Sequence, residues 1–134
     1  MAPQRIKSLT EFWPYYLREH RKPVTRAWHY LGSTLALLAL AALAVTSSPW
    51  FLLVGLVAGY GPAWVGHFGF EKNRPATFKY PLWSLACDWR MYFAWASGRL
   101  AGELQKAGVT DAKVELPPQP MHWADRRRDP GNRR

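Results

Sequence analysis

The residues of this sequence best suited to chemistry are its four histidines, His20, His29, His67 and His122. Glu71 follows His67 by four residues, so on a helix its carboxylate lies on the same face and can bind a metal or orient an imidazole ring. Imidazole together with carboxylate suits iron, zinc, copper or nickel. Three histidines and one glutamate around an open position would support oxygen chemistry on ferrous iron. His122 lies in a polar segment, where an ordinary solvated side chain is expected.

The distribution of charge indicates which elements position these histidines. Residues 1–26 carry a net charge of +4 and residues 71–134 carry +5, which together give the formal +9. The 44 residues between Arg26 and Glu71 contain no Lys, Arg, Asp or Glu. A basic nucleic-acid-binding surface has no place for such a stretch, so no nucleic-acid partner is expected.

The charge-free stretch is long enough for two membrane spans. About 40 apolar or small residues, 31–70, exceed what one helix needs to cross a hydrocarbon core of about 30 Å. The Ser-Ser-Pro sequence at 47–49 favours a turn, and lipid admits only helices or closed barrels. The sequence therefore predicts an all-α integral membrane protein. Its transmembrane helical hairpin has spans at about 26–46 and 49–70, in contact with the lipid bilayer.

This hairpin brings two histidines to the same depth. His29 precedes the turn residue Ser48 by 19 residues, and His67 follows it by 19. His20 lies nine residues before His29, and Pro23 between them allows the preceding segment to fold back over the mouth of the hairpin. We therefore expect the three imidazoles to converge at one membrane face.

Both flanks of the hairpin are basic, and Lys and Arg near the ends of spans are retained on the cytoplasmic side. Both termini are therefore expected to be cytoplasmic, at the cytoplasmic membrane of a bacterium or the endoplasmic reticulum of a eukaryote. Cys87 is the only cysteine, which excludes an intramolecular disulfide or a thiolate cluster and fits a reducing compartment. Residues 1–10 lack an apolar core, so a cleaved secretory signal is not expected.

An amphipathic segment precedes the hairpin. Apolar residues recur at spacings of three and four between Ile6 and Leu17, which predicts an N-terminal interfacial helix. Ser8 and Glu11 resemble a capping box. Because that start places Pro14 inside the helix, a start near Pro14 is an equally good alternative.

A C-terminal amphipathic helix is predicted over about 81–106. It either lies at the interface or packs against the hairpin as a short third span. Asp88 and Arg90 would be costly in lipid, so a full span is the weaker alternative. The chain is then one helical membrane domain, 1–108, followed by a polar, basic, disordered tail at 109–134.

Two segments carry a resemblance to a known family. They are HRKPVTRAWHYLG, from His20 to Gly32, and GHFGFEKNRPATF, from Gly66 to Phe78. With them the chain resembles, from about residue 9 to 100, a membrane family with a domain of unknown function that includes the yeast iron-dependent 2-hydroxy fatty acid dioxygenase. The sequence departs from the yeast pattern at Thr25, where that motif has Asn. Glu19 or Arg21 stands where the motif has an additional histidine.

The resemblance implies an Fe(II)-dependent dioxygenase of lipid α-oxidation, which uses O2 to shorten a 2-hydroxy fatty acid by one carbon. The catalytic and metal-binding histidines of the family map onto His20, His29 and His67, and its acidic position maps onto Glu71.

Three basic residues beyond His67 could pair with an acidic lipid head group and are the candidates for binding the substrate: Arg74, Lys79 and Arg90. Two other functions remain open. The first is a non-enzymatic small membrane protein that binds lipid or a partner, and the second is a haem-binding protein with His29 and His67 as axial ligands. A hairpin offers a small core, so a homodimer is a further expectation.

Overall fold

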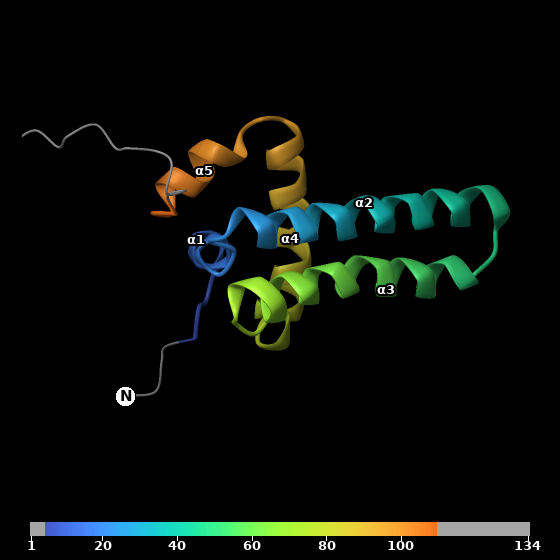
Figure 1. Ribbon diagram of the computed structural model, residues 1–134, viewed down its shortest axis with the longest axis horizontal. Helices are drawn as coiled ribbons and strands as arrows, with labels where there is room; N and C mark the ends of the chain where they lie inside the picture. Colours follow the sequence, from blue (N-terminus) through green and yellow to red (C-terminus); the bar gives the residue numbers. More distant parts are fainter. Residues whose placement is uncertain (1–4, 110–134) are drawn as a thin grey trace, which may run out of the picture.

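The computed structural model describes residues 5–109, and all regular secondary structure in that range is helical. Figure 1 shows α2 and α3 as a long antiparallel hairpin that projects from a base formed by α1, α4 and α5. The all-α class predicted from the sequence is confirmed. The elements in chain order are α1 (Leu9–Arg18), α2 (Pro23–Thr46), α3 (Trp50–Trp64), a π-helix (Val65–Glu71), a 3-10 helix (Ala76–Phe78), α4 (Pro81–Ala96) and α5 (Leu100–Lys106).

The two arms of the hairpin are candidate membrane-spanning helices by length and composition. They are α2, with 24 residues, and the continuous segment Trp50–Glu71, with 22. Only 22% and 17% of their most apolar windows are buried inside the protein, whereas the core helix of a soluble protein is mostly buried. Ser47 ends α2 in the left-handed conformation, with φ 56°. The two spans and the turn predicted from the sequence agree with these helices to within a few residues.

Small residues allow α2 and α3 to lie close together near the base. A Cβ at Gly32 would lie 2.5 Å from the carbonyl oxygen of Gly59, so only glycine fits there. The backbones of the two helices therefore meet directly at this level, three residues beyond His29.

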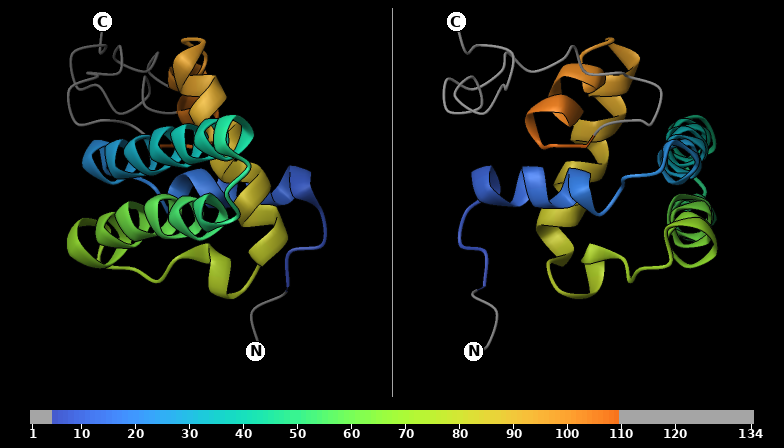
Figure 2. Two further views of the ribbon diagram at one scale, coloured as in Figure 1. Left: turned by 90° about the vertical axis from the view of Figure 1, so that its right-hand side faces the viewer. Right: turned by 60° about the vertical axis from the view of Figure 1, so that its left-hand side comes forward.

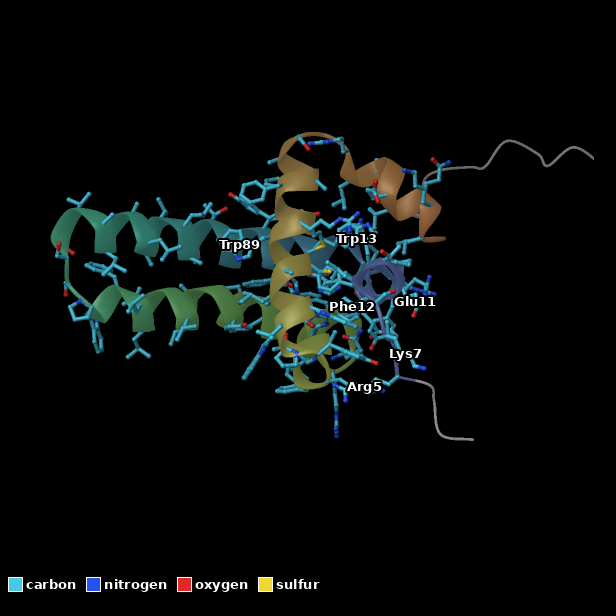
Figure 3. The ribbon with its side chains drawn as sticks, turned by 180° about the vertical axis from the view of Figure 1, so that it is seen from behind. Arg5, Lys7, Glu11, Phe12, Trp13 and Trp89 are labelled. Atoms are coloured by element: carbon cyan, nitrogen blue, oxygen red, sulfur yellow. The ribbon has the colours of Figure 1, made fainter. Side chains whose placement is uncertain are left out.

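An aromatic core holds the base together. The hydroxyl of Ser8 accepts a hydrogen bond from the backbone N–H of Glu11 at 3.2 Å, so α1 takes the first of the two predicted starts, with Pro14 inside the helix, and not the start near Pro14. Figures 1 and 2 show α1 and α4 lying across the hairpin axis, not along it. In Figure 3, Phe12 and Trp13 lie on the side of α4 away from the hairpin, and Trp89 lies toward it. The fully buried members of this core include Phe12, Tyr16, Leu17, Cys87 and Met91.

The single helix predicted over 81–106 is wrong, because the chain breaks at 97–99. Gly98 adopts φ 74°, and the N–H of Arg99 donates to the carbonyl of Ala94 at 2.8 Å. This glycine-terminated cap ends α4 and turns α5 back toward α1. A third span packed parallel to the hairpin is also not observed, since α4 crosses it (Figure 1). The predicted tail, from residue 110 onward, lies outside the described residues.

Candidate metal centre

Three histidines meet where the base joins the hairpin. His20 lies just after α1, His29 near the start of α2 and His67 in the π-helix. The Nε2 atoms of His20 and His29 are 3.0 Å apart, and those of His29 and His67 are 3.1 Å apart. Their side chains are 1%, 6% and 2% exposed. The expected convergence is therefore present, and the three residues form a group that can hold a metal ion.

The π-helix determines where His67 lies. Pro62 has no N–H to donate, so the α-helical hydrogen bonding is already interrupted one turn before Val65, and the wider π turns follow from there. Such turns are rare and occur frequently at functional sites. A Cβ at Gly66 would lie only 3.1 Å from the carbonyl oxygen of Thr25. Glycine therefore lets this turn press against α2 and brings His67 next to His29.

The outer nitrogen of each imidazole faces an oxygen atom. His20 Nδ1 donates to the backbone carbonyl of Tyr16 at 2.7 Å. His67 Nδ1 donates to Oδ1 of Asn73 at 2.7 Å, while the Asn73 amide group donates to the carbonyl and the carboxylate of Glu19. His29 Nδ1 lies 3.5 Å from Oδ1 of Asp88. Partners of this kind fix the ring and the tautomer of histidines that bind metals.

These contacts leave the inner nitrogens of His20 and His67 with a lone pair. A carbonyl oxygen can only accept, so the single N–H of a neutral His20 or His67 is on Nδ1, and Nε2 carries no proton. Burial, and then the neighbouring His29 and His67, lower the pKa of His20 well below its usual value, so this ring is neutral. The Nε2 of His29 lies between these two lone pairs, and a cation bound by all three nitrogens would satisfy them together.

The spacing fits one small metal ion. Imidazole nitrogens bind metals at about 2.0–2.1 Å, so two nitrogens at right angles around an ion lie roughly 2.9 Å apart, and two in tetrahedral positions roughly 3.4 Å apart. The observed 3.0 and 3.1 Å lie within this range, so the nitrogens could share one ion. Three protein ligands would leave other coordination positions of an octahedral ion open.

Glu71 is not brought into this cluster. Its carboxylate accepts hydrogen bonds from the backbone N–H groups of Arg21 and Lys22, at 3.2 and 3.0 Å, and from the hydroxyl of Thr25 at 2.7 Å. It therefore caps the start of α2 and neither binds with the histidines nor orients a ring. The glutamate predicted as a ligand instead fastens the end of the π-helix to α2.

Asp88 and Ser84, both on α4, are site residues that the sequence analysis missed, as is Asn73 beyond the π-helix. The Tyr16 hydroxyl donates to Oδ1 of Asp88, and burial raises the pKa of this carboxyl. The Ser84 hydroxyl is buried, has no hydrogen-bond partner among the described residues, and lines the same small cavity as the three histidines. The signal for Asp88 and Ser84 was an acidic residue in an apolar helix with a hydroxyl four residues before it.

The three basic residues predicted to bind substrate lie away from the histidines. Arg74 and Lys79 are exposed, and the Lys79 Nζ lies 5.9 Å from the ring centre of Tyr80. The guanidinium of Arg90 lies 4.2 Å from the ring centre of Trp13. None of the three lines the two cavities that reach His29.

The fold and the site define a helical protein with two candidate membrane spans and a buried three-histidine cluster that can bind a metal. Residues 6–100 match the family described as 2-hydroxy-palmitic acid dioxygenase Mpo1-like, and the chain belongs to that family. The resemblance seen in the sequence is thereby confirmed. Comparison with curated proteins and with solved structures gave no match.

Proposed function

We propose that this protein is an Fe(II)-dependent dioxygenase that shortens 2-hydroxy fatty acids by one carbon at a membrane face. The observation that carries the proposal is the set of three buried, converging Nε2 atoms, of which those of His20 and His67 carry no proton because their Nδ1 atoms donate to oxygen acceptors. The family description agrees with oxygen chemistry on such acids.

Ferrous iron, when bound, supplies O2 activation and a positive centre for the carboxylate and hydroxyl oxygens of the substrate. The reaction balances without another electron donor. One 2-hydroxy acid and one O2 give the fatty acid one carbon shorter, CO2 and water.

Residues around the histidines have separate tasks. Asp88 holds the outer nitrogen of His29, and Tyr16 holds Asp88 in place. A buried hydroxyl without a partner costs about 1–3 kcal/mol, so we assign to Ser84 a hydrogen bond to an oxygen atom of the substrate's head group. The surrounding aromatic core keeps water away from the site, which strengthens these polar interactions.

The same proposal places the hairpin in a bilayer. Exposed Leu and Val cover its outer faces, among them Leu38, Val45 and Val57, and soluble monomers rarely expose so large an apolar surface. With the hairpin along the membrane normal, α1 and α4 lie in the interface plane, where exposed aromatic residues such as Trp95 are favoured. The basic flanks put both termini in the cytoplasm.

The geometry does not favour haem. Two axial imidazole nitrogens lie on opposite sides of one iron, roughly 4 Å apart at ordinary bond lengths. His29 and His67 approach to 3.1 Å, and His20 stands beside both of them.

Metal analysis tests the proposal. Protein purified anaerobically in detergent should contain about one iron per chain, and the double variant His29→Ala with His67→Ala should contain none. His122→Ala is the matched control and should keep its iron. The loaded parent should consume O2 with 2-hydroxypalmitate. Absence of metal from the parent after reconstitution with ferrous iron would overturn the enzyme assignment and favour a lipid-binding or structural role.

A further inference from the structure

A long apolar groove begins at the histidine cluster and runs along the hairpin. It has a volume of about 410 Å³, within the range of roughly 300–1,000 Å³ that small-molecule sites occupy. His29 and Asp88 line both this groove and the small cavity around the histidines, so the two spaces are adjoining. The groove therefore has a polar end at the metal centre, and the rest of its wall is almost entirely apolar.

The walls come from one face of each hairpin helix. On α2 the lining residues recur at helical spacing from His29 through Ala36 to Leu40, and on α3 they run from Ala63 back to Phe51 and Leu52. From α4, Leu85 and Trp89 complete the wall at the base, and Figure 3 shows Trp89 on the hairpin side of that helix.

The small residues along the groove leave space that helix packing does not require. A Cβ at Gly55 would meet Ala39 at 3.5 Å and one at Gly59 would meet Ala36 at 3.6 Å, which are ordinary contacts. At Gly32, by contrast, a Cβ would collide with backbone. Close packing thus explains Gly32, but it leaves Gly55 and Gly59 without a structural reason.

The length of the groove suggests its ligand. Eleven residues separate His29 from Leu40, which at about 1.5 Å per residue is roughly 16 Å. Carbon–carbon bonds of about 1.5 Å meeting at about 111° advance roughly 1.25 Å each, so the groove takes an extended alkyl chain of about 13 carbons. Two further carbons at the metal centre give an acid of about 15 carbons.

We propose that this groove holds the alkyl chain of the 2-hydroxy acid, and that Leu40, Phe51 and Leu52 at its far end set the chain length. The inference rests on the proposed function, because the acid's head group must lie at the histidines. Leu40, Leu52 and Leu56 of its wall are also exposed at the outer surface of the hairpin, so the chain enters from the hydrocarbon layer without leaving it.

The first test changes the length of the groove. Ala36 lies seven residues from His29, so Ala36→Phe leaves room for roughly eight carbons. We expect turnover of 2-hydroxypalmitate to fall at least about tenfold, while 2-hydroxydecanoate is still used. Ala41→Phe, on an exposed position of the same helix outside the groove, is the matched control and should keep the parent preference. If the parent is active and Ala36→Phe keeps the parent's preference for 2-hydroxypalmitate over 2-hydroxydecanoate, the groove assignment is overturned. The assignment of the protein as an enzyme is not affected by that result.

The second test does not need turnover. A 16-carbon 2-hydroxy acid with a terminal diazirine is photolysed with the protein in lipid nanodiscs, and the adducts are mapped by peptide mass spectrometry. Adducts at Leu40, Phe51 or Leu52 that unlabelled 2-hydroxypalmitate suppresses support the proposal, even where no turnover is found. The proposal is overturned if the adducts are spread over outward residues such as Leu38 and Leu53, or if competition leaves them unchanged. Either result indicates that the probe contacts the hairpin only as a bilayer lipid does.

Discussion

Each histidine of the cluster is oriented by a partner from a different part of the chain. The backbone of Tyr16 in α1 holds His20, Asp88 in α4 faces His29, and Asn73 beyond the π-helix holds His67. For His20 and His67, the tautomer that leaves Nε2 without a proton is therefore set before any ion binds.

Asn73 offers the cleanest test of this orientation. Asn73→Ala removes the acceptor of His67 Nδ1, so the ring loses its fixed tautomer, and we expect the affinity for ferrous iron to fall about 10–100-fold. Competition with a chelator of known affinity measures the change. Asn132→Ala, the other asparagine of the chain, serves as control. Equal affinities in parent and Asn73→Ala would mean that Asn73 has no orienting role.

At the scale of elements, the site depends on how the π-helix meets the start of α2. Gly66 permits the backbone contact, and Glu71 closes it by binding two backbone N–H groups and Thr25. Carboxylates at a helix N-terminus stabilise it by satisfying N–H groups that have no partner within the helix. This contact holds His29 and His67 on the same side of the hairpin mouth.

The variant Glu71→Ala distinguishes the two possible roles of this side chain, which are to cap α2 and to bind the metal. Loss of a helix cap costs about 1 kcal/mol, which corresponds to a Tm lower by roughly 3–5 °C for a chain of 134 residues. Glu71→Gln keeps one acceptor oxygen, so its Tm should lie between those of the parent and Glu71→Ala. Glu11→Ala, on an exposed position of α1, is the control and should have nearly the Tm of the parent. Iron content at saturating iron should be unaffected in Glu71→Ala. A sharp loss of metal with no change in Tm would restore the ligand role first inferred from the sequence.

Sequence patterns predicted the positions of the histidines better than the identity of their partners. Equal spacing of His29 and His67 from Ser48 fixes their common depth in any antiparallel hairpin, so their meeting follows from chain geometry. Asp88 and Asn73 reach the site only through the crossing of α4 and the turn after the π-helix, which no local periodicity encodes. Glu71 was misassigned because a four-residue spacing predicts a shared face only on an α-helix, and this segment is π-helical.

The whole molecule places its histidine cluster at the boundary between a base with its own core and an apolar hairpin. The base has a core of its own, whereas only a small part of the apolar hairpin is buried inside the protein. An apolar substrate with a charged head fits that boundary, since its chain stays among apolar residues and its carboxylate meets the buried polar cluster. The arrangement therefore joins the proposed membrane placement to the proposed chemistry.

Cysteine accessibility tests the membrane placement directly. In a Cys87→Ala background, which removes the only native cysteine, Ser48→Cys lies in the hairpin turn and Lys7→Cys lies before α1. The proposed topology requires that a membrane-impermeant maleimide applied to intact bacterial spheroplasts label Ser48→Cys. Lys7→Cys should react only after permeabilisation, because the basic flanks hold the base inside. The reverse pattern would mean an inverted hairpin. Recovery of the protein in the soluble fraction after an alkaline carbonate wash would mean that the hairpin does not cross the bilayer, and the groove would then face a partner surface instead of lipid.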